Sequence, residues 1–320
     1  MKAGVICSHP PFILQIGFLM TVIDLSSLFR RLALVGGCLV GLLWLAPADA
    51  ANFSRLENGK YILTAAGCVG CHTTNKDNDK GMILGGGRAL KTPFGVFYAP
   101  NITPHPENGI GKWTEANFIE AMRNGKNPDG EHYLPVFPYT SYTQIADRDL
   151  QDLWTYMQTL PALDHENVPH GAPFIFRMRF TLGPWKMINF KPGAFKPRED
   201  QSVEWNRGAY LVNALGHCGE CHTPRNLMGG LKSDMYHSGS NDGPDGEAIP
   251  NITMDKDTGI GDWSEDDLDY LLSMGMLPDG DFVGSSMAEV VENTGKLRPE
   301  DRKAIITYLR STPAISNKVN

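Results

Sequence analysis

The sequence repeats itself at an offset of 150 residues, and this repeat limits the fold more than any other feature. The pattern Cys-x-x-Cys-His occurs at 68–72 and again at 218–222. At the same offset, the stretches 100–130 and 250–280 share 13 of 31 positions, among them Pro-Asn-Ile-Thr and Gly-Ile-Gly blocks. Similarity at one long offset indicates a duplicated unit. We therefore expect two tandem domains of the same fold.

Each copy contains one Cys-x-x-Cys-His motif, which is the attachment pattern of haem c. Two cysteines three positions apart lie on one side of a helical turn. There they can form thioether bonds with the two vinyl groups of one porphyrin, and the next histidine can bind the iron. A disulfide, a redox-active thiol pair or half of a zinc site are the alternatives. The residues expected to hold two haem c groups are Cys68, Cys71, Cys218 and Cys221, with His72 and His222 as iron ligands.

The composition is that of a globular protein. Hydrophobic residues make up 42% of the 320 residues and charged residues 20%, which is too apolar for a disordered chain and too polar for a multi-span membrane protein. The net charge is −7 and no basic stripe is present, so nucleic acid is excluded as a partner.

The first 50 residues have the features of an export signal. Arg30 and Arg31 precede an apolar run at 32–46, and small residues follow up to an expected cleavage after Ala50. The run is shorter than the roughly 20 residues of a spanning helix, and an uncleaved anchor is the alternative. Residues 1–19 precede a stretch from Met20 that reads as an ordinary signal, which suggests that translation starts at Met20 and that the first 19 residues are not part of the protein. Export predicts a periplasmic protein.

Helix signals recur in both copies, so we expect a mostly α fold. We expect helices to start at residues 54 and 202 and at Asp147 and Pro299. Thr114 and Ser264 are the expected caps of another helix in each copy, and Gly125 and Gly275 its expected ends. The two domains are expected at 51–160 and 205–320. The joining segment 161–204 contains six prolines and several aromatic residues, so we expect it to pack over the domain interface.

The chain resembles the diheme class I cytochromes c that form electron-accepting subunits of periplasmic alcohol and gluconate dehydrogenases. The resemblance rests on the two haem motifs, the Asn-Ile-Thr…Gly-Ile-Gly-x-Trp blocks and the sequence FPYTSY at 137–142. It implies two tandem class I cytochrome c domains with one covalently bound haem each, in a bacterial periplasm and at the inner-membrane surface. Relatives often have three haems and Met-Pro-Tyr where this chain has Phe137-Pro138-Tyr139.

The second axial ligand of the iron distinguishes the two copies. Class I cytochromes take a methionine from the loop before the last helix, and Met287 is the expected ligand of haem 2. The 150-residue offset aligns Met287 with Phe137, which cannot bind iron. We expect His132 to bind haem 1, with another donor or an open position as the alternatives.

Four further residues are expected around the haems. The carbonyl groups of Pro100 and Pro250 can accept a hydrogen bond from the Nδ1–H of the iron-binding histidines and so fix their orientation. Arg88 and Arg225 can bind haem propionates.

These features predict an electron-transfer protein rather than an enzyme. Electrons would pass from a dehydrogenase or quinol to a downstream cytochrome or oxidase, so the expected partners are redox proteins, with association at the inner membrane. The alternative is a haem enzyme with thiosulfate or peroxide chemistry at a haem 1 that lacks methionine. A redox or gas sensor is a third hypothesis.

Overall fold

The computed structural model describes residues 54–74, 83–171, 173, 178–243 and 246–319. All of them belong to one compact unit, Phe53–Asn320. The segment 1–50, for which the sequence predicts an export signal, lies outside the described residues. Within the described ranges, no helix combines the length and the apolar character needed to cross a membrane.

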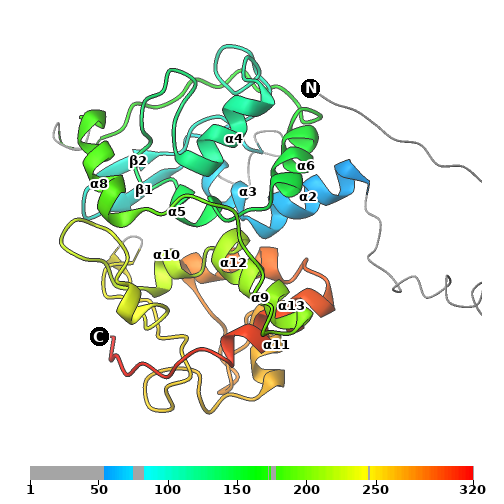
Figure 1. Ribbon diagram of the computed structural model, residues 1–320, viewed down its shortest axis with the longest axis vertical. Coiled ribbons are helices and arrows are strands. Elements are labelled where there is room, and N and C mark those ends of the chain that lie inside the picture. Colours follow the sequence, from blue (N-terminus) through cyan, green and yellow to red (C-terminus); the bar gives the residue numbers. More distant parts are fainter. Residues whose placement is uncertain (1–53, 75–82, 172, 174–177, 244–245, 320) are drawn as a thin grey trace, which may run out of the picture. The chain divides into compact units, whose positions relative to one another are not determined.

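Helices dominate the described residues, as the sequence predicts (Figure 1). We call residues 54–160 the first half and 205–319 the second half. The first half contains α2 (Arg55–Ala65), α3 (Cys68–His72), α4 (Glu115–Asn124), α5 (Tyr139–Tyr142) and α6 (Asp147–Met157). The joining segment contains α8 (Leu182–Asn189), after a 3-10 turn at Arg179–Thr181. Then come α9 (Val203–Tyr210), a π-helical stretch (Leu211–Leu215), α10 (Gly219–His222), a 3-10 turn (Ser233–Met235), α11 (Glu265–Met274), α12 (Ser285–Thr294) and α13 (Pro299–Leu309).

The described residues contain one two-stranded sheet. Strands β1 (Ala89–Thr92) and β2 (Gly95–Tyr98) pair antiparallel, with Ala89 opposite Tyr98. The residues of β1 show no alternation of polar and apolar side chains, so their sequence does not predict a strand.

Local signals set the helix ends. Thr114 and Ser264 cap α4 and α11 through reciprocal hydrogen bonds with the residue three positions later. Gly125 and Gly275 end the same helices in the left-handed conformation, with φ of 59° and 81°. The starts of α6 and α13 are also confirmed.

Each half is built on one pair of packed helices. α2 packs against α6 in the first half, and α9 packs against α13 in the second (Figure 1). Glycine permits both contacts: a Cβ at Gly59 would lie 2.1 Å from the carbonyl oxygen of Asp152, and one at Gly208 would lie 1.9 Å from that of Ala304. The apolar side chains of Ile62 on α2 and Ile305 on α13 are buried in the core of the protein.

The described part of the joining segment contacts both halves. The ammonium group of Lys186 on α8 donates to the carbonyl oxygens of Asn124 and Gly125, at 2.6 and 2.9 Å. The indole of Trp185 donates to the carbonyl oxygen of Met228 in the second half. The segment is therefore packed rather than a free tether.

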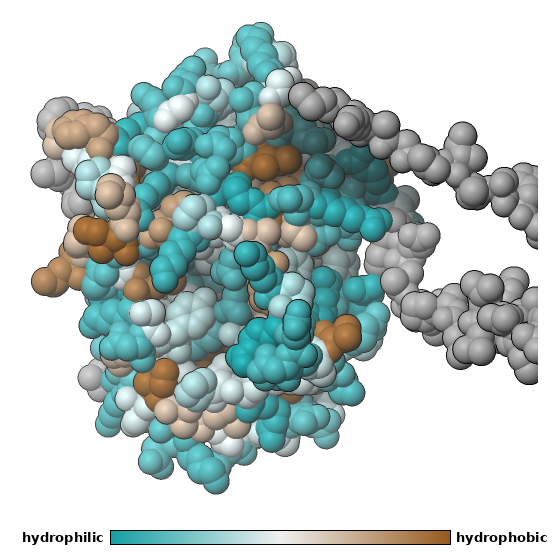
Figure 2. Space-filling view, in the orientation of Figure 1, coloured by the Kyte–Doolittle hydropathy of each residue, from teal (hydrophilic) through white to brown (hydrophobic). Residues whose placement is uncertain are grey.

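Exposed apolar side chains gather around α8 (Figure 2). Met187 and Ile188 are 87% and 69% exposed, and Leu227 is fully exposed beside Met228. The hydrogen bond from Trp185 to Met228 joins α8 to this loop. Contiguous exposed apolar groups mark interaction surfaces.

The two halves also contact each other directly. The hydroxyl of Tyr61 on α2 donates to the carboxylate of Asp301 on α13. Thr140 and Ser141 on α5 both donate to Glu220, which lies inside the second Cys-x-x-Cys-His motif. The two motif-bearing regions are thereby fixed relative to each other.

Candidate haem-binding sites

The two Cys-x-x-Cys-His motifs form the short helices α3 and α10 and position their histidines in the same way. The Nδ1 atom of His72 lies 2.7 Å from the carbonyl oxygen of Pro100, and Nδ1 of His222 lies 2.7 Å from that of Pro250. Because a carbonyl only accepts, Nδ1 must hold the proton in each ring. The Nε2 lone pair is then free to bind a metal.

The Pro-Asn-Ile-Thr blocks hold these carbonyl groups in place. The Asn101 side-chain oxygen accepts hydrogen bonds from the amide and the hydroxyl of Thr103, and Asn251 makes the same pair of bonds with Thr253. All four side chains are buried. The identity of the two blocks was visible in the sequence, but the role of the asparagines in the turn was not.

Cys68, Cys218 and Cys221 are free thiols in the structure. Burial, with a smaller effect of Cys71, raises the pKa of Cys68 to about 12. Burial and Cys221 raise the pKa of Cys218 likewise to about 12. Protonated thiols in this position are compatible with thioether formation on a porphyrin.

Burial also lowers the pKa of His72 and His222, against the opposite effect of their hydrogen bonds to carbonyl oxygens. Both imidazoles are therefore neutral at neutral pH, which is the form that binds iron. Two thiols and a neutral histidine oriented by a carbonyl group make up the donor set that haem c requires, so the residues of both halves fit the group.

Arg88 and Arg225 occupy equivalent places at the two motifs. Arg88 donates to the carbonyl oxygen of Gly70, and Arg225 donates to that of Glu220, the residue preceding the second cysteine in each motif. Arg88 also pairs with Glu289 and Arg225 with the Glu220 side chain. Binding of propionates by these arginines stays a prediction.

One difference between the halves lies behind the histidines. Leu84 and His237 both have φ of 67°, and both donate their backbone N–H to the threonine that follows the motif, Thr73 or Thr223. His237 is buried, and its Nε2 atom has no hydrogen-bond partner. Burial and the neighbouring His222 lower the pKa of His237 to about 3. No motif in the sequence points to His237.

Comparison with known proteins decides the family. A family model described as Cytochrome c matches residues 56–161. The chain is 42% identical over 298 residues to a "Diheme cytochrome c-type" of Cereibacter sphaeroides, which covers 90% of this chain and 99% of that protein. The chain belongs to the cytochrome c family.

Two further relatives of this cytochrome are subunits of larger enzymes. It is 39% identical over 273 residues to the "Fructose dehydrogenase cytochrome subunit" of Gluconobacter japonicus, covering 84% of this chain and 54% of that protein. It is 36% identical over 276 residues to the "Gluconate 2-dehydrogenase cytochrome c subunit" of Pantoea cypripedii, covering 83% and 61%. The cytochrome thus spans little more than half the length of these two subunits.

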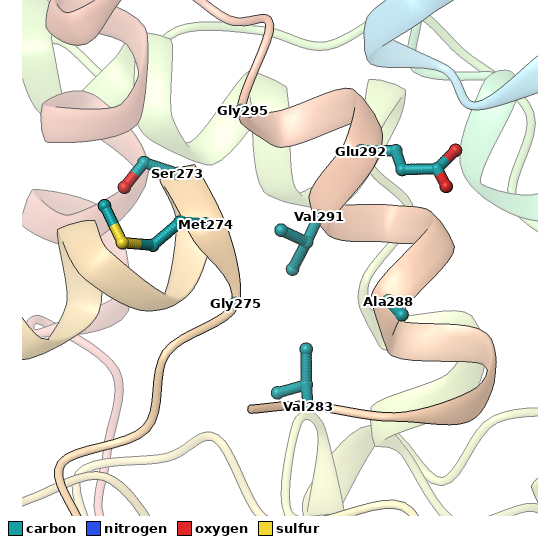
Figure 3. Close-up of a pocket in the computed structure, with 8 residues that line it drawn as sticks. All are labelled: Ser273, Met274, Gly275, Val283, Ala288, Val291, Glu292 and Gly295. Carbon is teal, nitrogen blue, oxygen red and sulfur yellow. The ribbon is translucent and has the colours of Figure 1, made fainter. Parts of the chain in front are cut away.

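Met287 lies half-buried in the first turn of α12. A cavity of about 370 Å³ separates this helix from the end of α11 (Figure 3). Val283 and Val291 project into the cavity, and Gly275 forms part of its wall. In the first half of the cytochrome, the ring of Tyr139 packs directly against Gly125.

The counterpart of Met287 follows from equivalent hydrogen bonds in the two halves. Tyr133 donates its N–H to the carbonyl of Gly125, and Val283 donates to that of Gly275, so the offset is still 150 there. The last helices start at Asp147 and Pro299, an offset of 152. Met287 therefore corresponds to Phe137 or Pro135, and neither has an iron-binding atom.

His132 lies beside α8. A Cβ placed on Gly183 would be 3.8 Å from Nε2 of His132, and the buried Nδ1 atom has no partner. Burial and the nearby ammonium groups of Lys186 and Lys126 lower the pKa of this histidine. His132 thus lies next to the joining segment. Its role as a ligand of haem 1 stays a prediction.

The two motifs lie close together in this cytochrome. The hydroxyl of Tyr142 donates to the carbonyl of Ala66, 2.7 Å away, and its ring lies 5.2 Å from that of His217, which immediately precedes Cys218. Burial and Glu220 raise the pKa of Cys221 to about 11, with a further contribution from Cys71 of the other motif.

Proposed function

We propose that this cytochrome is an exported diheme electron carrier that takes electrons from a periplasmic dehydrogenase or quinol and passes them to a downstream cytochrome or oxidase. The observation that carries the proposal is the matched pair of His–carbonyl hydrogen bonds of 2.7 Å, each beside the two cysteines of its motif. A haem c at each motif would supply one reversible one-electron couple.

The side chains then have positioning roles. Cys68 and Cys71 would tether haem 1, and Cys218 and Cys221 would tether haem 2. The carbonyl groups of Pro100 and Pro250 orient the iron-binding histidines and raise their basicity. Met287 would complete haem 2, and methionine–histidine ligation favours a high potential.

The similarity to cytochrome subunits of fructose and gluconate dehydrogenases supports a dehydrogenase as electron donor. The proximity of the two motifs supports transfer between the haems within one chain. The apolar surface formed by Met187, Ile188, Leu227 and Met228 suits contact with a redox protein. Periplasmic location and attachment at the inner membrane belong to the same proposal.

Haem content and reducibility test the proposal. The protein is expressed with its own N-terminal segment in a bacterium that exports haem c, recovered from the periplasmic fraction, and its haem counted as the pyridine complex. Two haems per chain are expected, and one when both cysteines of a motif are replaced, in either Cys68→Ala/Cys71→Ala or Cys218→Ala/Cys221→Ala. Reduction by a quinol or a purified sugar dehydrogenase, followed by oxidation by a second cytochrome, tests electron transfer. Absence of covalent haem would contradict the proposal.

Phe137 supports a second candidate function, catalysis at haem 1 with thiosulfate or peroxide. Turnover of either compound by the purified protein, lost in Cys68→Ala/Cys71→Ala and kept in Cys218→Ala/Cys221→Ala, would support it. A protein that exchanges electrons but turns over neither compound would leave the carrier function alone.

A further inference from the structure

The helix that carries Met287 contacts the haem motif of the other half. A Cβ placed on Gly70, inside the first Cys-x-x-Cys-His motif, would lie 3.6 Å from the carboxylate of Glu289 on α12. A Cβ on Gly67, just before this motif, would lie 3.7 Å from the side-chain nitrogen of Asn293, also on α12. The helix with the expected second ligand of haem 2 therefore lies against the residues that would hold haem 1.

An ion pair joins α12 to this motif. Arg88 donates to the carboxylate of Glu289 at 2.5 Å and also to the carbonyl oxygen of Gly70. One guanidinium group thus links the helix of the second half to the motif of the first. The two charged side chains are 31% and 33% exposed. Because water and salt screen partly buried charges less than exposed ones, the pair stabilises this contact.

The contact of α12 with its own half is incomplete. Hydrogen bonds hold its two ends, from Ser286 to the carboxylate of Glu247 and from Thr294 to the carbonyl oxygen of Leu272. Between these ends, the cavity of about 370 Å³ separates α12 from the end of α11, and Val291 projects into it (Figure 3). A helix beside unfilled space lacks the packing contacts that would fix its position there. The contact with the first half supplies part of what this side lacks.

Met287 and Glu289 lie on different sides of α12. Two positions along an α-helix correspond to a rotation of about 200° around its axis. A methionine that faces haem 2 therefore leaves Glu289 on the side that faces the first half, where Arg88 lies. The ion pair can act on Met287 only through the position of the helix.

The second motif has a corresponding contact with the first half. Thr140 and Ser141 on α5 both donate to the side chain of Glu220. Glu220 precedes the second cysteine of its motif, as Gly70 does in the first. Each half thus contacts the motif of the other at the same place, and in the first motif the contacting carboxylate comes from the helix that carries Met287.

We propose that Glu289 is a positioning residue for haem 2: its ion pair with Arg88 of the first half holds α12 where Met287 can reach the iron. The inference rests on the proposed attachment of haem c to both motifs and on Met287 as a ligand of haem 2. Without the ion pair, Met287 would be off the iron in a larger fraction of molecules. An added ligand would then bind haem 2 more tightly, because its apparent affinity rises with the fraction that is open.

Competition with imidazole tests the inference. The oxidised protein is titrated at pH 8, where imidazole is mostly neutral, and binding to haem 2 is followed as loss of the near-infrared methionine–iron band. Glu289→Ala should raise the imidazole affinity about fivefold, which corresponds to about 1 kcal/mol from the lost ion pair. The matched control is Val290→Ala, the next position of α12, which is 39% exposed and should keep the wild-type affinity. Unchanged affinity in Glu289→Ala would overturn the inference.

Variants of opposite charge separate the ion pair from a general effect of charge. Arg88→Ala, in the first half, should also raise the imidazole affinity of haem 2 about fivefold. The double variant should exceed neither single variant, because each already removes the pair. Glu289→Gln, which can still accept a hydrogen bond from Arg88, should give a smaller increase than Glu289→Ala. Changes of opposite sign in Glu289→Ala and Arg88→Ala, or additive changes in the double variant, would overturn the inference.

The haem count and the near-infrared band separate this inference from the proposed function. Two haems per chain with no methionine–iron band in the wild type, or with a band that persists in Met287→Leu, would overturn the inference and leave the electron carrier intact. Fewer than two haems per chain in the wild type would overturn both.

Discussion

Two tyrosine hydroxyls three residues apart have opposite surroundings. Tyr142 donates to the carbonyl of Ala66 at 2.7 Å. The hydroxyl of Tyr139 is buried and has no hydrogen-bond partner, while its ring packs on Gly125 and under the ammonium group of Lys186, 4.4 Å from the ring centroid. A buried polar group without a partner costs free energy.

The two hydroxyls should therefore respond differently to removal. Tyr139→Phe should raise the free energy of unfolding by about 1 kcal/mol, because it removes an unpaired polar group and keeps the ring contacts. Tyr142→Phe should lower it by about 1 kcal/mol, since the carbonyl of Ala66 loses its donor. Urea unfolding of the haem-loaded protein, followed by circular dichroism, measures both. Equal changes in the two variants would show that the Tyr139 hydroxyl is paired.

At the scale of elements, the closest helix contacts depend on single glycines. Gly59→Ala would place a methyl group 2.1 Å from the carbonyl oxygen of Asp152 and force α2 away from α6. We expect a loss of about 3 kcal/mol in the free energy of unfolding. The control is Gly183→Ala on α8, where the nearest atom lies 3.8 Å away and alanine favours the helix. A loss in the control as large as in Gly59→Ala would refute the steric explanation.

Elements governed by neighbouring residues were predictable from the sequence. Caps at Thr114 and Ser264 and stops at Gly125 and Gly275 act within one helical turn, and each is present. The haem motif is likewise local. Strand β1 was missed because its residues alternate between exposed and half-buried rather than between polar and apolar.

Contacts between distant segments were not predictable in the same way. Nothing near Arg88 in the sequence indicates its bond to Gly70, and the packing of His132 against α8 depends on how the joining segment folds back. Counting residues at a constant offset aligns Met287 with Phe137, but the hydrogen bonds and helix starts show that the offset changes from 150 to 152 nearby, so that Pro135 is an equal counterpart.

At the scale of the whole molecule, one buried carboxylate joins the two halves. Asp301 on α13 accepts hydrogen bonds from Arg207 at 2.8 and 2.9 Å, from Arg298 at 2.9 Å, and from Tyr61 on α2. Burial acts to raise its pKa, but Arg207, Tyr61 and Arg298 together lower it from 3.8 to about 2. The carboxylate is therefore stabilised in its charged form in the folded protein.

This arrangement makes the stability of the molecule depend on acid. A lowered pKa contributes stability above the unfolded value of 3.8, and the contribution is lost as the pH falls toward 2. The shift corresponds to about 2 kcal/mol. We expect Asp301→Asn to lose about 3 kcal/mol at pH 7, because two arginines keep their charge without the carboxylate. The difference in the free energy of unfolding between Asp301→Asn and the wild type should then become smaller by about 2 kcal/mol as the pH falls from 5 to 2.

Urea unfolding of both proteins across this pH range measures the gap, and haem-linked acid effects cancel in the difference. The control is Asp266→Asn on the exposed side of α11, which should follow the wild type within about 0.5 kcal/mol at every pH. Tyr61→Phe removes the two hydrogen bonds of this hydroxyl that cross between the halves, the one donated to Asp301 and the one accepted from the N–H of Arg298. It should weaken the wild-type pH dependence without abolishing it, because Arg207 and Arg298 still hold the carboxylate. A gap that stays constant from pH 5 to pH 2 would show that Asp301 titrates alike in the folded and unfolded chains.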